Sequence, residues 1–110
     1  MEHLPEGLKG EKLTAISFVD DDQIRMEFGK NIFLMYQWPV VTIDGNKIDE
    51  DNAAYRDTLT GLVDETVVAT KLNEGESLLL KLSKAEIVLS LSDDEESFYF
   101  KAANGEWMVG

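Results

Sequence analysis

Residues 24–35 read IRMEFGKNIFLM, and this stretch decides the fold. Apolar and charged residues alternate in its first half, so Ile24, Met26 and Phe28 are expected to share one face of a half-buried strand. The glycine, lysine and asparagine at 29–31 have the composition of a tight turn. The pattern therefore predicts two strands joined by a turn.

The second half of the stretch continues as an unbroken apolar run over 32–36. A run without polar residues is typical of a strand covered on both faces, and that is the expectation here. Trp38 and Pro39 then interrupt the sheet, because proline has no backbone N–H to donate to a ladder. A short hairpin is expected next, with its turn at 44–46.

Further strands are predicted on both sides of this region. Residues 12–19, rich in β-branched and aromatic side chains, precede it, and the acidic run that follows them is expected to be a loop tip. Later strands are expected at 66–71, 77–82 and 86–91. Asn104 and Gly105, flanked by aromatic segments, predict a C-terminal β-hairpin that covers one end of the core.

One short helix is predicted, at about 51–61. Asp51 or Asn52 can cap its start, and Gly61 marks its expected end. A helix of about two to three turns is unstable by itself, so its apolar stripe must lie on a sheet. The stripe consists of Tyr55, Leu59 and Leu62.

A shift of 54 positions superimposes the hydrophobic pattern of one half of the chain on the other. Leu8 then matches Leu62, Phe28 matches Leu82, and the match continues through both turns. Two β-meanders with turns of similar length would also align in this way, and that alternative stays open. The expected fold is mainly β, a single domain over 1–110. Two pseudo-repeated antiparallel β-meanders, about 8–38 and 62–92, form a barrel or sandwich.

Four short segments resemble a group of small bacterial β-rich proteins. The similar segments are 13–19, 38–41, 89–91 and 105–107, and they are distributed over most of the length of the chain. Their shared motifs are structural, and no activity is assigned to that group. The resemblance therefore implies a β-rich bacterial protein and carries over no functional residue.

The composition excludes several kinds of chemistry. The 110 residues include no cysteine, which removes disulfides, thiolate nucleophiles and cysteine-type zinc sites. The only histidine is His3, so a Ser-His-Asp arrangement is not expected. With 22 acidic and 10 basic residues the net charge is −12, which disfavours binding to nucleic acid. No signal-peptide pattern or membrane-length apolar run occurs, so a cytoplasmic location is expected.

No catalytic, cofactor-binding or metal site is predicted. Residues 44–52 fail the calcium-loop pattern, because neither the frame that starts at Asp44 nor the frame that starts at Asp49 places glycine at position 6 of the loop. Phosphate-binding glycine motifs are absent. A glycosidase would need two carboxylates across a cleft, and a sequence cannot show such convergence. The protein is therefore expected not to be an enzyme.

The charge favours a basic protein partner. A compact, acidic, cysteine-free domain is similar in kind to the immunity proteins of bacterial toxin systems, which neutralise cationic toxins and nucleases. Acidic loops would steer the partner and aromatic residues would anchor it. The expected steering residues are Asp20, Asp21, Asp22, Asp93, Asp94, Glu95 and Glu96, followed by Asp49–Asp51, and the expected anchors are Tyr36 and Trp38.

Two other functions stay open. The β halves could enclose an apolar ligand, in a cavity lined by Met26, Phe28, Phe33, Leu80 and Leu82. Alternatively, an exposed sheet edge could pair with a second copy of the chain and form a homo-oligomer. The sequence does not decide the oligomeric state.

Overall fold

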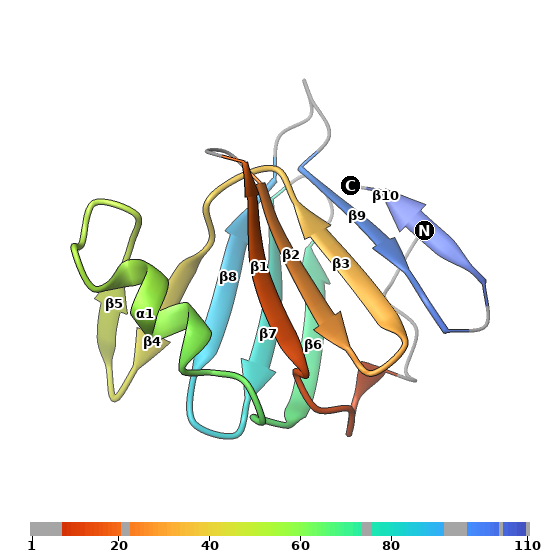
Figure 1. The fold of residues 1–110 in the computed structure, drawn as a ribbon, viewed down its shortest axis with the longest axis horizontal. Helices are drawn as coiled ribbons and strands as arrows, with labels where there is room; N and C mark the ends of the chain where they lie inside the picture. Colours follow the sequence, from red (N-terminus) through yellow and green to blue (C-terminus); the bar gives the residue numbers. More distant parts are fainter. Residues whose placement is uncertain (1–7, 21–22, 74–75, 92–96, 104, 110) are drawn as a thin grey trace.

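The computed structural model describes residues 8–20, 23–73, 76–91, 97–103 and 105–109, which form ten strands and one short helix (Figure 1). The strands make two five-stranded antiparallel sheets that face each other as a sandwich (Figure 1). The prediction of a mainly β fold with one short helix is confirmed. Of the two architectures left open by the sequence, the barrel is not formed, because the sheets are not closed.

The first sheet joins the hairpin of residues 24–35 to the C-terminal hairpin. In spatial order it contains β1 (Ala15–Asp20), β2 (Gln23–Phe28), β3 (Asn31–Met35), β9 (Phe98–Lys101) and β10 (Trp107–Val109). The second sheet contains β5 (Asn46–Ile48), β4 (Val40–Ile43), β8 (Glu86–Ser90), β7 (Ser77–Leu82) and β6 (Val67–Asn73). The helix α1 (Tyr55–Thr60) lies in the connection between β5 and β6 and contacts β1.

The interior of the sandwich is one cluster of apolar side chains from both sheets. Alternate residues of β2 and β3 are buried in it, as the period-2 pattern predicted. Ile32 and Leu34 of β3 are only half-buried, on the outer face of the first sheet. The prediction that this strand is covered on both faces is therefore wrong. The apolar run reflects an outer face that is itself partly apolar.

The helix is shorter than the predicted 51–61. Its N-cap is Ala54, without a side-chain capping bond, so the predicted cap at Asp51 or Asn52 is wrong. The Asn52 side chain instead accepts a hydrogen bond from the Ala54 amide, at 2.8 Å, in a turn that precedes the helix. Gly61 ends the helix as predicted, and the apolar stripe is buried.

The two meanders have the same strand register at the offset of 54 seen in the sequence. Four facing pairs of the first meander each have a counterpart 54 residues later in the second. These pairs and counterparts are Ile16–Met26 and Thr70–Leu80, Phe18–Ile24 and Leu72–Leu78, Ile24–Met35 and Leu78–Leu89, and Met26–Phe33 and Leu80–Ile87. Turns of equal length fix equal registers, so two β-meanders with similar turns would also show this agreement, and that alternative stays open.

The segments that join the two meanders are related by a pseudo-two-fold axis. The Leu13 amide donates to the Glu65 carbonyl at 2.9 Å, and the Val67 amide donates to the Glu11 carbonyl at 2.9 Å. Because 13 + 54 = 67 and 11 + 54 = 65, each bond is the counterpart of the other. Lys12 likewise forms an antiparallel bridge with Thr66, its own counterpart. A ladder of this kind arises when two equivalent segments pair across a two-fold axis.

The hairpins are exchanged between the two halves. The hairpin β4–β5 follows β3 in the chain but pairs with β8, while β9–β10 follows β8 and pairs with β3 (Figure 1). The spatial orders β1-β2-β3-β9-β10 and β6-β7-β8-β4-β5 are therefore equivalent strand by strand. A duplicated unit that contributes its hairpin to the opposite sheet would give this arrangement. The duplication itself stays a prediction.

The pseudo-symmetry predicts that Asp64→Gly stabilises the protein. Asp64 has φ of 83°, in the left-handed region, and its counterpart Gly10 has φ of 91°. A non-glycine residue is strained there, so the substitution should raise the free energy of unfolding by about 0.5–1 kcal/mol in urea denaturation. Asp64→Asn removes the charge but keeps the Cβ atom, and it should give less of this gain. Equal gains from both variants would mean that the charge, and not the backbone, is responsible.

Candidate functional site

An aromatic cluster forms where the chain crosses from the first sheet to the second. Trp38 lies in this crossing, between β3 and β4, and its ring packs against Phe18 of β1 and Tyr55 of α1. The ring centroids of Trp38 and Phe18 are 6.5 Å apart, and those of Trp38 and Tyr55 are 5.9 Å apart in an edge-on arrangement. We call these residues, together with Arg56, the Trp38 cluster.

Arg56 covers the aromatic rings from the solvent side. Its guanidinium carbon lies 4.7 Å from the centroid of the Phe18 ring and 5.8 Å from that of Trp38. A guanidinium at these distances is attracted to the electron-rich ring faces. Arg56 thus stabilises the cluster while remaining exposed itself.

Tyr55 anchors the cluster to the interior. It is buried, and its hydroxyl donates a hydrogen bond to the Pro39 carbonyl. Burial, followed by the nearby charges of Glu50 and Asp49, raises the pKa of the Tyr55 hydroxyl well above its ordinary value of 10.0. The phenol therefore stays neutral, and the two carboxylates lie close enough to the cluster to influence it.

A hollow of about 380 Å³ opens beside the cluster, lined by Trp38, Glu50, Asn52, Ala53, Tyr55 and Arg56. Glu50, the middle residue of the acidic segment Asp49–Asp51, lines it, and all three residues of the segment are exposed. This segment is shaped by its own side chains, since the Asp49 carboxylate accepts a hydrogen bond from the Asp51 amide at 3.1 Å. Carboxylates and aromatic rings thus share one small concave surface.

The structure places some of the predicted site residues here and leaves others undescribed. Trp38 is central to the cluster, and the segment Asp49–Asp51 flanks it. Tyr36 is half-buried, and its amide donates to the Ser97 carbonyl at 2.8 Å. Asp20 is the last residue of β1. The other predicted steering residues, Asp21, Asp22, Asp93, Asp94, Glu95 and Glu96, lie outside the described residues.

Sequence reasoning missed Phe18 and Arg56 as members of the cluster. They are 38 positions apart in the chain (56 − 18 = 38), and only the contact of α1 with β1 brings them together. Tyr55 was assigned to the buried face of the helix, which is correct but does not reveal its contact with Trp38. One signal was available, because Arg56 is the only basic residue between Lys47 and Lys71.

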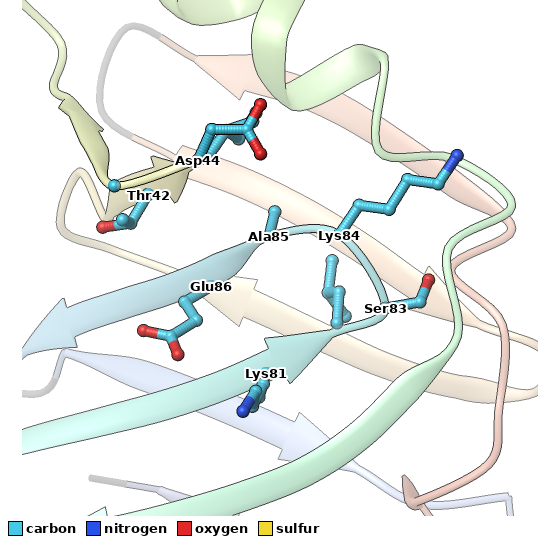
Figure 2. A pocket seen from close by; sticks show the side chains of 10 residues that line it. Thr42, Asp44, Lys81, Ser83, Lys84, Ala85 and Glu86 are labelled. Atoms are coloured by element: carbon cyan, nitrogen blue, oxygen red, sulfur yellow. The ribbon is translucent and has the colours of Figure 1, made fainter.

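A second hollow, of about 640 Å³, lies between the turn of the hairpin β4–β5 and the turn between β7 and β8 (Figure 2). Its charged lining residues do not converge on one point, since the Lys81 and Lys84 side chains point away from each other (Figure 2). The Lys84 amide donates to the Glu65 carboxylate at 2.7 Å. The arrangement is not that of a preorganised charged site.

The pseudo-two-fold axis explains this second hollow. Ala85, which lines it, is the counterpart of Asn31 (31 + 54 = 85). In the first sheet the Asn31 side chain accepts a hydrogen bond from the Ala103 amide at 2.9 Å and so connects the meander to its added hairpin. Alanine cannot make this bond, so a gap stands at the equivalent place in the second sheet.

The predicted ligand cavity is occupied by its own lining. Met26, Phe28, Phe33, Leu80 and Leu82 are all buried and belong to the apolar cluster of the core. Of these five side chains, only Leu82 borders either of the two hollows. In the described part of the chain these five side chains belong to the packed core, and the carrier function stays a prediction.

The described part of the chain contains no group of three or more His, Cys, Asp or Glu residues arranged to hold a metal ion. Among these same residues, no helix has the length and apolar character that a membrane crossing requires. Comparisons with protein-family models, with curated proteins and with solved structures found no match to this chain.

Proposed function

We propose that this protein is a non-enzymatic binding module for a basic protein, with the Trp38 cluster as its anchor. The partner would be a cationic toxin or nuclease that the module neutralises in the cytoplasm, without binding nucleic acid or membrane itself. One juxtaposition supports this assignment: the exposed residue Glu50, between Asp49 and Asp51 in the chain, lines the same hollow as Trp38 and Tyr55. Tryptophan, tyrosine and arginine are the residues most often found at the energetic centre of protein interfaces.

The local charge fits a basic side chain. Asp49, Glu50 and Asp51 carry −3 and Arg56 carries +1, which leaves −2 around the hollow. The Arg56 guanidinium lies over the rings of Phe18 and Trp38, so it is held on the aromatic side of the hollow. A partner lysine or arginine entering beside Trp38 would meet the carboxylate of Glu50, which lines the same hollow.

Of the acidic residues that the structure describes, most lie outside the strands, and this supports steering. In the described chain the strands contain only Asp20, Glu27 and Glu86 as acidic residues. The loops therefore present the greater part of the negative charge. Such a field increases the rate of encounter with a basic protein and weakens as salt is added.

The test is capture of proteins from a bacterial lysate at low salt, followed by titration of the purified captured protein. The site variant reverses Asp49, Glu50 and Asp51 to lysine, and Trp38→Ala removes the anchor. A matched control reverses the exposed residues Asp44, Glu76 and Glu106, which lie outside the hollow and change the net charge by the same amount.

We expect a basic captured protein that binds the site variant and Trp38→Ala at least about tenfold more weakly, whereas the control triple loses much less. Binding by wild type should weaken as salt rises. If the site variant and the control triple lose equal affinity for the captured protein, the overall negative charge alone explains binding, and the proposed site is contradicted. Capture of acidic proteins would contradict the proposed function as a whole.

The Tyr55 hydroxyl gives a pH-dependent prediction. Its folded-state pKa is raised above the ordinary value of 10.0, so the hydroxyl contributes stability that is complete below pH 10 and is lost as pH rises above it. Tyr55→Phe should cost about 1 kcal/mol at neutral pH by removing the hydrogen bond to Pro39. The difference in the free energy of unfolding between wild type and Tyr55→Phe should become smaller above pH 10. A difference that stays the same below and above pH 10 would contradict the prediction.

A further inference from the structure

The outer face of the first sheet carries an unusual set of side chains. It is the face opposite the core, and cross-strand pairing places its residues from four of the five strands, β2, β3, β9 and β10, in two rows of four. The first, which we call the arginine row, contains Arg25, Leu34, Tyr99 and Val109. The second, which we call the tryptophan row, contains Glu27, Ile32, Lys101 and Trp107.

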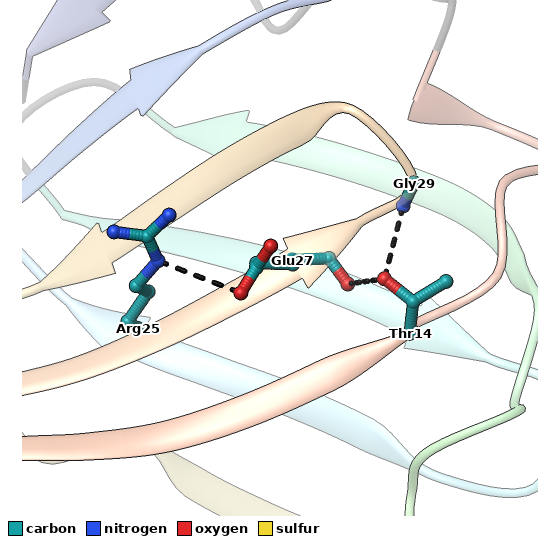
Figure 3. Close-up of polar contacts among 4 residues, drawn as sticks. All are labelled: Thr14, Arg25, Glu27 and Gly29. Atoms are coloured by element: carbon teal, nitrogen blue, oxygen red, sulfur yellow. Dashed lines mark hydrogen bonds and ion pairs between the residues drawn. The ribbon is translucent and has the colours of Figure 1, made fainter.

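This face is open to solvent and partly apolar. Trp107 is 65% exposed and Val109 is 43% exposed, and the Trp107 ring stacks on Tyr99 with centroids 6.3 Å apart. Figure 3 shows Arg25 and Glu27 side by side on β2, joined by an ion pair of 3.6 Å. The same figure shows the Thr14 hydroxyl bridging the Glu27 carbonyl and the Gly29 amide, which holds this end of β2 in place. Exposed aromatic patches of this kind mark interaction surfaces.

The pseudo-two-fold axis supplies an internal comparison. In the hairpin that takes the equivalent place in the second sheet, Lys47 faces Thr42 as Trp107 faces Lys101. Lys47 is exposed, and the hairpin β4–β5 forms with this lysine at the equivalent position. The fold therefore does not require an exposed tryptophan at 107, and this side chain needs another explanation.

We propose that this face binds a second copy of the chain. The proposal rests on charge and apolar self-complementarity, which an isologous dimer requires. A two-fold axis that runs across the strands between the two rows would lay the arginine row of one copy on the tryptophan row of the other. On each strand, a residue then meets the partner's residue that lies two positions away in sequence.

The resulting contacts match in every column. Arg25 meets Glu27 of the other copy, Leu34 meets Ile32, Tyr99 meets Lys101, and Val109 meets Trp107. Opposite charges face each other, apolar groups face apolar groups, and the tyrosine ring faces a cation. The two sheets would pack with antiparallel strands, in the aligned geometry of a β-sandwich.

The same operation fails on the outer face of the second sheet. There the row equivalent to the arginine row contains the apolar residues Leu79, Val88 and Val40. The row equivalent to the tryptophan row contains Lys81, Glu86, Thr42 and Lys47. Laying one row on the other would place apolar side chains against charges, which is unfavourable. Self-complementarity is thus a property of the first sheet only.

The experiment is sedimentation equilibrium of the full chain over roughly 5 to 500 µM, a range that detects the weak dimers formed by small interfaces. The wild-type mass should rise from monomer towards dimer and stop there. Arg25→Glu should weaken dimerisation at least about tenfold, and the double exchange R25E/E27R should restore it. Trp107→Lys, which copies the residue type of Lys47, should also weaken it without loss of folding, as checked by circular dichroism.

Leu79→Glu is the matched control, because position 79 is the counterpart of Arg25 (25 + 54 = 79) on the second sheet and gains a negative charge. It should change the dimer affinity by less than about threefold. A monomeric wild type over the whole range would overturn the proposal and leave the face to another partner. So would growth beyond the dimer, failure of R25E/E27R to restore association, or an equal loss in Leu79→Glu.

Salt separates this proposal from the proposed function. Two copies with a net charge of −12 repel each other, so added salt should strengthen or leave unchanged their association. Binding of a basic partner at the Trp38 cluster should weaken under the same conditions. Either proposal, the dimer or the binding of a basic partner, can therefore fail while the other holds.

Discussion

Phe33→Ala is expected to lower the free energy of unfolding by about 3–5 kcal/mol, the largest effect of any single substitution considered. Phe33 is completely buried in the middle of β3. The centroid of its ring lies 5.3 Å from the ring centroid of Phe98 and 5.1 Å from that of Phe100, and both residues belong to β9. Truncation removes the contacts that connect the first meander to the exchanged C-terminal hairpin, and it leaves a cavity between two aromatic rings.

Urea denaturation measures this effect, and a milder variant protects the test against a complete loss of folding. Ile87 is the counterpart of Phe33 (33 + 54 = 87) and is also buried. Phe33→Ile therefore places at 33 a residue that the equivalent site accommodates, and it should cost about 1–2 kcal/mol. Val68→Ala, at a 40% exposed side chain, should cost less than about 1 kcal/mol. Equal costs in all three variants would contradict the core position of Phe33.

The β-meanders could be predicted because local patterns determine them. Alternation over 24–28 predicted the buried face of β2, and strands at 77–82 and near 86–91 were confirmed as β7 and β8. The turn at 44–46 and the C-terminal hairpin were also confirmed. In each case the periodicity of a few consecutive residues specifies the face that must be buried.

The exchange of hairpins could not be predicted from these patterns. A strand's periodicity shows which of its faces is buried, but it does not show which neighbour supplies its backbone hydrogen bonds. The hairpin β4–β5 could have paired with β3, which precedes it, and it pairs with β8. Likewise, the burial of only one face of β3 depends on the absence of a further layer, which the apolar run alone does not reveal.

The candidate site was predicted in part, at Trp38 and at Glu50 of the acidic segment Asp49–Asp51. Trp38 was recognised because a tryptophan next to Pro39 stands at a break in the sheet pattern. Its partners Phe18 and Tyr55 come from segments that the pattern assigns to the core, and the tertiary fold alone brings them to the same surface. Cation–ring contacts such as that of Arg56 leave no periodic signal in a sequence.

Asn31→Ala is expected to have the second-largest effect, a loss of about 2–3 kcal/mol, because Asn31 is a buried polar residue that makes two hydrogen bonds. Its amide nitrogen donates to the Phe28 carbonyl at 2.9 Å and closes the turn between β2 and β3. Its amide oxygen accepts from the Ala103 amide at 2.9 Å and so ties that turn to the hairpin β9–β10.

Removal of the Asn31 side chain should therefore act at two places, and hydrogen exchange can separate them. The Ala103 amide should exchange faster in Asn31→Ala than the global loss of stability explains, because its acceptor is gone while the neighbouring strand β9 stays paired with β3. Asn73→Ala is the matched control, since the Asn73 side-chain amide donates a long hydrogen bond, of 3.4 Å, to the Ser77 hydroxyl across the turn after β6. It should cost less than about 1 kcal/mol and leave Ala103 unchanged. Because Ala85 holds the equivalent position in the second sheet, a cost as small as that of the control would mean that each hairpin is held by strand pairing alone.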